Sequence, residues 1–209
     1  MRLAILGPPG SDRETIAGTI AARLGVPSIS LADAVQTEMR ANTPAARQAL
    51  RHMNAGELVP DQTLLSIIRD RLTQPDVTAG FVLDGFPNHA VTTVALDALL
   101  AELGTPIDRV IDLVLPDAEV LRRLIGRRTC RNCARTWHTE LVVPTRPNAC
   151  DRCGGEPVQR HDDPDRITAG LQSYRPAAAA TLRHYHAMGK LTSIDATLTP
   201  TEITAKALA

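Results

Sequence analysis

The sequence predicts an α/β fold, a doubly wound parallel sheet of five strands. Short apolar segments alternate with longer segments of helical periodicity along most of the 209 residues. The apolar segments lack polar alternation, as expected of parallel strands that are covered on both faces. One region, residues 129–161, breaks this rhythm and is rich in Arg, Pro, Gly and Cys. We expect it to be a small insertion held together by something other than an apolar core.

The strands are expected in chain order at Arg2–Leu6, Ser28–Ser30, Phe81–Leu83, Val110–Leu115 and Leu191–Ile194. The helices are expected at Thr15–Leu24, Leu31–Glu38, Pro44–Met53, Asp61–Leu72, Ala90–Leu103, Asp117–Arg128, Asp165–Ala187 and Pro200–Leu208. The last helix has the clearest start, because Thr199 can cap it, Pro200 suits its first position and Glu202 follows the cap by three residues.

Composition argues against several classes of partner. The chain has 23 Lys and Arg residues and 23 Asp and Glu residues, so its net charge is zero. The overall charge therefore does not favour binding to nucleic acid or to an anionic membrane. Aromatic residues make up only 2% of the chain, which disfavours a stacking platform for single-stranded nucleic acid. The first residues are too short and too soon broken by Gly and Pro for a signal peptide, and no apolar run approaches a membrane span. We therefore expect a cytoplasmic protein.

Four cysteines form a metal-binding pattern in the insertion. Cys130 and Cys133 form one pair, Cys150 and Cys153 the other, in the spacing C-x2-C-x16-C-x2-C. Two-residue spacing lets both thiolates of a turn reach one tetrahedral ion, so we expect a structural Zn²⁺ with no open coordination position. The alternative is four free or redox-active thiols. His138 could replace one thiolate but is more simply an ordinary packing or surface residue.

Several motifs together carry a family resemblance. GPPG at 7–10 follows the first strand, and the chain continues with AGELVPD at 55–61, GFVLDGFP at 80–87, GRR at 126–128, the four cysteines and QRHDD at 159–163. With these motifs in this order, the chain resembles the adenylate kinases, in the bacterial long form with a zinc-bearing lid. The resemblance implies a P-loop NTPase-like core formed by 1–30, 61–128 and 162–209. It also implies a helical monophosphate-binding flap at 31–60 and a zinc lid at 129–161.

The resemblance further implies an activity and its site. ATP and AMP would exchange a phosphoryl group under a mobile lid, with Mg²⁺ accompanying the nucleotide, in a protein that we expect to be a monomer. Catalytic roles would fall to Arg13, Asp84, Arg123, Arg127 and Arg160. Nucleotide contacts would fall to Gly7, Gly10, Thr15, Val59, Gly85 and Asp162. Some of these residues also have an ordinary structural alternative: Arg123 and Arg127, four apart on a predicted helix, could form surface ion pairs.

The phosphate loop departs from the family at its centre. Where the family has glycine, lysine and glycine, this chain has Asp12, Arg13 and Glu14. The glycines let backbone N–H groups close around phosphate oxygens, and the lysine reaches the outer phosphates. A carboxylate about 5 Å from a phosphate charge costs roughly 3 kcal/mol at an effective dielectric constant near 20. Arg13 supplies a cation, but it could instead pair with its acidic neighbours. Alternatively, Asp12 caps the helix and the loop is a structural turn.

Other positions depart from the family as well. Two phosphate-gripping arginines of the family are Gln36 and Asn88 here, its threonine near the AMP base is Leu31, and its adenine-reading glutamine is Thr92. A lid-side arginine aligns with Gly170. Because losses fall on both the donor and the acceptor side, we expect strongly reduced or absent kinase activity. The alternatives are a working adenylate kinase that uses Arg13, and a phosphotransferase with a different small-molecule acceptor.

Overall fold

The structure, a computed structural model, describes residues 1–209 except 56, 58, 134 and 160–162. Its elements in chain order are β1 (Arg2–Leu6), α1 (Arg13–Leu24), β2 (Ser28–Ser30), α2 (Leu31–Ala41), α3 (Pro44–Asn54), α4 (Asp61–Leu72), η1 (Pro75–Val77), β3 (Phe81–Asp84), α5 (Ala90–Glu102), β4 (Arg109–Val114), α6 (Asp117–Ile125), β5 (Arg127–Cys130), β6 (Thr136–His138), β7 (Pro157–Gln159), α7 (Pro164–Ala187), β8 (Leu191–Asp195) and α8 (Pro200–Leu208). The five predicted strands of the main sheet are confirmed to within one residue at each end.

The main sheet is parallel throughout, in the order β2-β3-β1-β4-β8. This arrangement confirms the predicted five-stranded parallel sheet. β1 lies in the middle, with Ile5 in register with Asp84 of β3, and the Gly85 N–H donates to the Ile5 carbonyl over 2.9 Å. Consequently the loop that follows β1 emerges beside the carboxyl end of β3, where α/β sheets commonly bind ligands.

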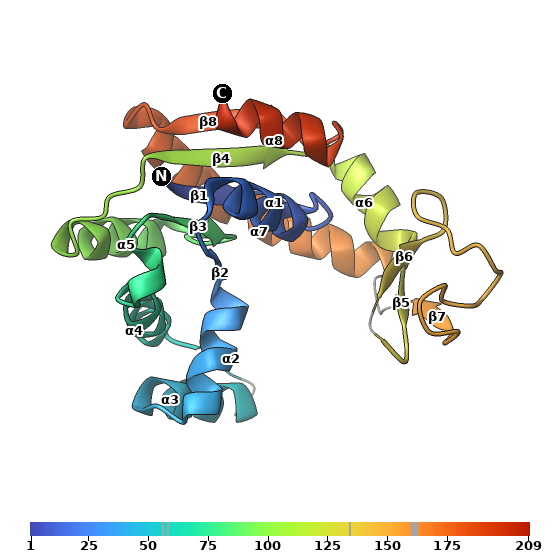
Figure 1. The fold of residues 1–209 in the computed structure, drawn as a ribbon, viewed down its shortest axis with the longest axis horizontal. Helices are drawn as coiled ribbons and strands as arrows, with labels where there is room; N and C mark the ends of the chain where they lie inside the picture. Colours follow the sequence, from blue (N-terminus) through green and yellow to red (C-terminus); the bar gives the residue numbers. More distant parts are fainter. Residues whose placement is uncertain (56, 58, 134, 160–162) are drawn as a thin grey trace. The chain divides into compact units, whose positions relative to one another are not determined.

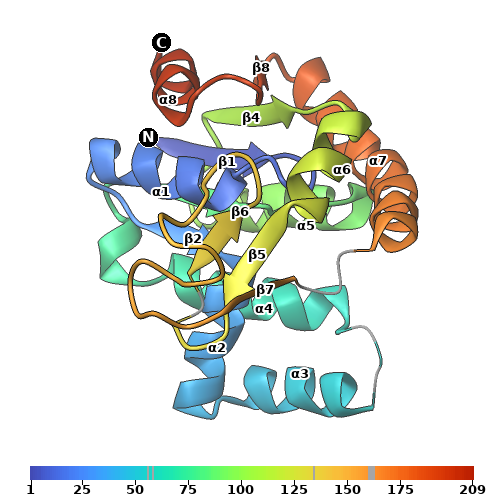
Figure 2. The same ribbon diagram turned by 90° about the vertical axis from the view of Figure 1, so that its right-hand side faces the viewer.

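Helices cover both faces of this sheet, which explains why its strands are apolar on both sides. α1 and α8 lie over one face, and α5 and the second half of α7 lie over the other (Figures 1 and 2). Phe81, Leu83, Ile67, Leu96 and Tyr185 are each at most 1% exposed in the core beneath α4, α5 and α7. The loops at the strand ends are thereby held on a rigid layer.

The chain divides into two compact units. The first comprises Met1–Gly7, Asp12–Val114 and Pro176–Ala209, and the second comprises Pro8–Ser11 and Leu115–Arg175. This division places the segment 31–60 in the first unit and 129–159 in the second; the finer partition into core, flap and lid stays a prediction. Among the described residues, no helix is long and apolar enough to cross a membrane.

The second unit contains a small antiparallel sheet in the order β6-β5-β7. The predicted helix Asp117–Arg128 is wrong over its last three residues, because α6 ends at Ile125 and Arg127 begins β5. Pairing with two strands satisfies the backbone of 127–130 better than a further helical turn would. A Cβ on Gly126 would lie 2.3 Å from the His138 ring, so the chain needs glycine where it turns from α6 into β5.

Candidate functional site

The phosphate loop joins β1 to α1 through residues 7–12. Pro8 and Ser11 form a tight turn, in which the Ser11 N–H donates to the Pro8 carbonyl over 3.2 Å. Gly10 has a φ of 82°, and Asp12 has a φ of 55°, a left-handed conformation that glycine adopts more readily than aspartate. Although Asp12 stands at the N-cap of α1, its side chain makes no capping hydrogen bond. The loop therefore makes a tight turn and has a carboxylate at a backbone conformation better suited to glycine.

Arg13, on the first turn of α1, contacts three groups of the sheet edge. Its Nε donates to Oδ1 of Asp84, and its Nη1 donates to the Gly7 carbonyl over 3.2 Å. The guanidinium also lies against Gly85, where a Cβ would come within 2.6 Å of the arginine Cζ. The sequence suggested pairing with the acidic neighbours Asp12 or Glu14, whereas the structure pairs Arg13 with a carboxylate 71 residues away. The cation at the lysine position is thus engaged by the protein.

Arg123, on α6 in the second unit, is engaged in a similar way. Its Nε donates to Oε1 of Glu119 over 2.8 Å, and its Nη1 donates to the Gly10 carbonyl over 3.1 Å. Hydrogen bonds from Arg122 and then Arg123 lower the pKa of Glu119 to about 2. Glu119 was missed from the sequence, although its spacing of three and four residues from the two arginines is a usual sign of helical ion pairs.

Arg13 and Arg123 therefore each donate a hydrogen bond to a backbone carbonyl of the phosphate loop, Arg13 to that of Gly7 and Arg123 to that of Gly10. A phosphate site works in the opposite sense, because the loop presents N–H groups and nearby cations to an incoming anion. Within each unit, the positive charge already has a carboxylate partner: Asp84 for Arg13 and Glu119 for Arg123. A phosphate that recruited either cation would have to compete with that carboxylate.

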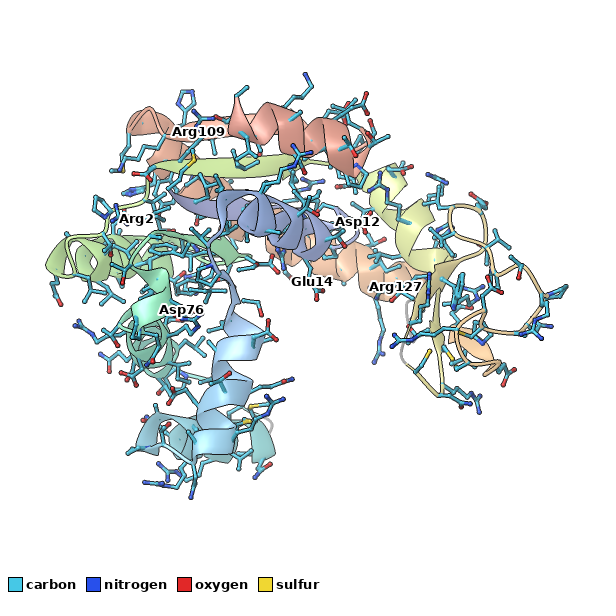
Figure 3. All side chains as sticks on the ribbon, in the orientation of Figure 1. Arg2, Asp12, Glu14, Asp76, Arg109 and Arg127 are labelled. Carbon is cyan, nitrogen blue, oxygen red and sulfur yellow. The ribbon has the colours of Figure 1, made fainter. Side chains whose placement is uncertain are left out.

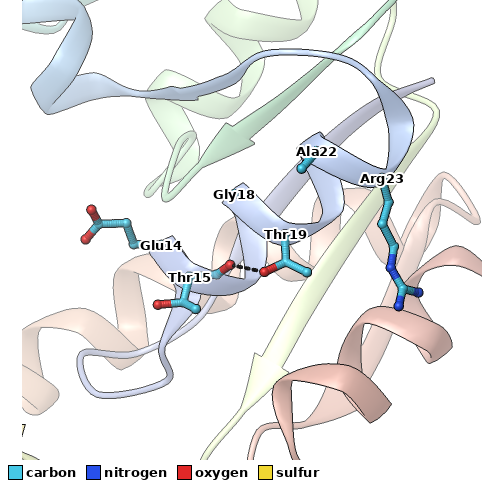
Figure 4. Close-up of a pocket in the computed structure, with 6 residues that line it drawn as sticks. All are labelled: Glu14, Thr15, Gly18, Thr19, Ala22 and Arg23. Atoms are coloured by element: carbon cyan, nitrogen blue, oxygen red, sulfur yellow. Dashed lines mark hydrogen bonds between the residues drawn. The ribbon is translucent and has the colours of Figure 1, made fainter.

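The first turns of α1 expose the two residues that follow Arg13. Glu14 and Thr15 line a shallow, open hollow along the helix, together with the small residues Gly18 and Ala22 (Figure 4). The Thr19 hydroxyl donates to the Thr15 carbonyl over 2.8 Å within this hollow. Asp12 and Glu14 are both labelled at the N-terminal end of α1 in Figure 3, and both are exposed. Two carboxylates thus stand at the helix end that would otherwise favour an anion.

The positions that the resemblance assigns to the acceptor side carry neutral residues, and the side chain of one of them, Thr92, is held by the fold. Thr92 is buried and its hydroxyl donates to the His89 carbonyl over 2.9 Å at the start of α5. The same hydroxyl lies 3.4 Å from the Asn88 amide oxygen. Gln36 is exposed on α2, and a Cβ on Gly170 would meet nothing within 4 Å. There is room for longer side chains at Gly170, but no cation is supplied there.

The remaining predicted site residues are distributed as follows. Asp84 and Gly85 lie beside Arg13, Val59 is half-buried against the main core, and Arg127 opens β5. Because Arg127 is in a strand, its predicted helical spacing from Arg123 does not exist. Arg160 and Asp162 lie outside the described residues. The nucleotide roles of all these residues stay predictions.

The four cysteines of the second unit converge as predicted. The Sγ atoms all lie within 4.8 Å of one another, in a cluster formed by Cys130, Cys133, Cys150 and Cys153. Cys130 and Cys153 are 3.5 Å apart at sulfur, and Cys133 and Cys150 are 3.6 Å apart. A tetrahedron with zinc–sulfur bonds of about 2.3 Å has edges of about 3.8 Å, whereas a disulfide would require about 2.05 Å. The cluster therefore fits structural zinc and leaves no coordination position open.

The neighbouring thiols of the cluster affect each other's ionisation. Burial opposes ionisation of Cys150, but hydrogen bonds from the backbone of Arg152 and of Cys153 act against it, and the pKa of Cys150 is lowered to about 6. A hydrogen bond from the Gly155 backbone favours the Cys153 thiolate, but the adjacent thiols of Cys133 and Cys130 prevail and raise its pKa to about 12. A divalent ion at the centre would remove this conflict, because it favours every thiolate at once.

The surroundings of the cluster explain how so small a segment can pack. Trp137 is 4% exposed against Cys130 and Cys150, and the Arg135 guanidinium lies 4.7 Å from its ring centroid. The His138 ring makes other contacts, since its Nδ1 accepts hydrogen bonds from the Glu140 and Leu141 N–H groups over 2.9 and 3.0 Å, and its Nε2 lies 3.3 Å from the Arg122 carbonyl oxygen. Among the described residues, the cluster that could hold a metal consists of the four cysteines.

Comparison with known proteins agrees with this geometry. A family model described as adenylate kinase matches residues 5–190. The chain is 46% identical over 209 residues to an adenylate kinase of Salinispora tropica, covering all of this chain and 96% of that protein. It is 45% identical to an adenylate kinase of Acidothermus cellulolyticus, covering all of this chain and 97% of that protein. An adenylate kinase of Archaeoglobus fulgidus is 39% identical over 94% of this chain and 91% of its own length.

Proposed function

The chain belongs to the adenylate kinase family. We propose that it catalyses phosphoryl transfer from ATP to AMP weakly or not at all. One observation carries this proposal. The guanidinium of Arg13, at the position of the phosphate-binding lysine, is bound to Asp84 and to the Gly7 carbonyl. Phosphoryl transfer depends on positioning and positive charge around the transferring group, so a cation neutralised by the protein is of little use to it.

Charge at the loop supports the same proposal. Asp12, Arg13 and Glu14 sum to −1, whereas glycine, lysine and glycine sum to +1. The guanidinium itself is a planar fork and does not replace a compact ammonium group within a tight loop. On the acceptor side, Gln36 and Asn88 supply hydrogen-bonding groups but no charge for the phosphate of AMP. The donor and acceptor halves would therefore both bind phosphate poorly.

The proposal is tested by measuring ADP formation from ATP and AMP in a coupled assay. ATP and AMP binding should be measured by calorimetry on the same preparation. The Salinispora tropica relative, purified identically, is the positive control. We expect turnover far below a typical rate on the order of 10 per second, and weak binding of ATP. Turnover at that rate with micromolar ATP binding would contradict the proposal.

A second candidate, a working adenylate kinase that uses Arg13, is favoured by the full-length likeness to proteins of that name. It requires the Arg13–Asp84 pair to open when ATP arrives. The same assay decides between the two. Repeating it with acceptors that lack a phosphate tests whether Gln36 and Asn88 have changed the acceptor instead.

We further propose that the protein acts as a monomer on small nucleotides in the cytoplasm. The adenylate kinase family itself implies binding of ATP and AMP. Light scattering on the purified protein tests the oligomeric state. A stable dimer at micromolar concentration would contradict the proposed monomer.

A further inference from the structure

We infer that the Arg13 guanidinium serves as a built-in cation at Asp84, so that any nucleoside phosphate held by this loop binds without Mg²⁺. The inference rests on the proposed function, since it takes the loop between β1 and α1 as the phosphate site of the family. It adds a specific ligand chemistry: the free, magnesium-less form of a nucleoside di- or triphosphate.

The position of Asp84 makes it the group that a divalent ion would need. Mg²⁺ in nucleotide sites is usually held by one or two carboxylates together with the phosphates. Asp84 ends β3 beside the phosphate loop, and its side chain is only 5% exposed. A buried carboxylate requires a partner of positive charge, and Arg13 supplies it through the bond from Nε to Oδ1. The residues therefore do not fit Mg²⁺ at Asp84 while this bond exists.

Two further contacts fix the guanidinium in place. Nη1 donates to the Gly7 carbonyl over 3.2 Å, so one guanidinium joins the end of β1 to the end of β3. Gly85 has a φ of 72°, and its missing side chain leaves the space that the guanidinium fills, since a Cβ would lie 2.6 Å from both Cζ and Nη2. Carboxylate, carbonyl and glycine thus form a complete binding place for one cation, and Arg13 occupies it.

This arrangement has a consequence for substrates. A divalent ion brought by a nucleotide would meet the positive guanidinium where it needs the carboxylate, and the like charges would repel each other. A nucleotide free of metal makes no demand on Asp84 and leaves the bond between Arg13 and Asp84 intact. Mg²⁺ should therefore leave the affinity of this protein for ADP unchanged or lower it.

The test is calorimetric titration of ADP into the full chain with millimolar Mg²⁺ and with EDTA. We expect equal affinities within twofold, or weaker binding with Mg²⁺. Manganese relaxation measurements on the same samples should show no Mn²⁺ held by the protein beyond that bound to ADP. A tenfold gain in ADP affinity with Mg²⁺, or a distinct protein-bound Mn²⁺ signal, overturns the inference.

Three variants make the test specific. Arg13→Gln removes the cation and leaves Asp84 buried, so this variant should gain stability from Mg²⁺ with ADP, seen as a rise in Tm of roughly 2–4 °C or more. Arg23→Gln, the matched loss of a cation from the last turn of α1, should show no Mg²⁺ effect. Adding Asp84→Asn to Arg13→Gln should abolish the gain. If Arg13→Gln is indifferent to Mg²⁺, the inference fails; if it does not fold, the titrations of the unmodified chain decide.

The outcomes separate this inference from the proposed function. An inactive protein whose ADP binding strengthens with Mg²⁺ overturns only the inference. A protein that turns over ATP and AMP at a typical rate with no requirement for Mg²⁺ overturns only the proposed loss of activity.

Discussion

The four-cysteine cluster and the phosphate loop are both short motifs, but they differ in how their central residues are arranged. The cluster has every ligand that its spacing predicts, with all four sulfurs close enough for one ion. The loop has Asp12, Arg13 and Glu14 at its centre, and Arg13 is bound to Asp84 at the end of β3. Under the function we propose, folding requirements persist where phosphate-binding requirements have relaxed, since zinc stabilises the fold whether or not the protein is a catalyst.

The largest expected effect tests the cluster side of this comparison. Cys150→Ser replaces a fully buried ligand, and structural zinc contributes on the order of 10–16 kcal/mol to folding in small zinc domains. Metal analysis should show a fall from about one zinc per chain to far less, and hydrogen exchange within 129–159 should accelerate strongly. His138→Gln, a neighbouring non-ligand, should keep its zinc. A metal-free wild-type protein with an ordered 129–159 segment, or one with two disulfides, would refute the zinc assignment.

The second effect tests the loop side. Restoring the family residues with Asp12→Gly, Arg13→Lys and Glu14→Gly should strengthen ATP binding, because each removed carboxylate relieves roughly 3 kcal/mol of repulsion at a dielectric constant near 20. Calorimetry should detect a gain of at least about 100-fold in affinity for 3 kcal/mol. The variant Asp12→Asn with Glu14→Gln removes the charge alone and should recover part of this gain. An unchanged affinity in the triple variant would show that the loop residues do not limit binding.

A third measurement connects the two regions through lid closure. Lids of this kind close over bound nucleotide, so closure should follow the state of the phosphate loop. Hydrogen exchange across 129–159 should be nearly the same with and without ATP in the unmodified chain, and several-fold slower with ATP in the triple variant. Strong ATP-dependent protection of the unmodified chain would instead support the working-enzyme candidate.

The smallest effect concerns the ion pair that holds Arg123. Hydrogen bonds from Arg122 and Arg123 lower the pKa of Glu119 from 4.5 to about 2, so its contribution to stability is complete above pH 4.5 and is lost as the pH falls toward 2. Because Arg122 is 41% exposed, we expect Glu119→Gln to cost at most about 1 kcal/mol at neutral pH. Urea unfolding at pH 7 and pH 3 should show the difference between variant and wild type shrinking in acid. Glu140→Gln, a more exposed partner of Arg122, is the control, and an equal loss at both pH values would contradict the pairing.

Local signals in the sequence determined the main sheet, most of the helices and the zinc ligands. Apolar runs without alternation require cover on both faces, and paired two-residue cysteine spacing requires one shared ion, so each outcome follows from nearby residues. The start of α8 was equally local: the Thr199 side chain accepts from the Glu202 N–H over 3.3 Å, and Glu202 in turn accepts from the Thr199 N–H.

Only the tertiary structure decided what the charged residues of the site contact. The sequence placed Arg13 beside two acidic neighbours, but α1 directs it to Asp84, which becomes adjacent only because β3 pairs with β1. The end of α6 was likewise set by strand pairing in the second unit, which drew Arg127 into β5. Propensity and spacing act over a few residues, whereas an ion pair or a strand partner is chosen by the sheet order, and that order depends on contacts far apart in the chain.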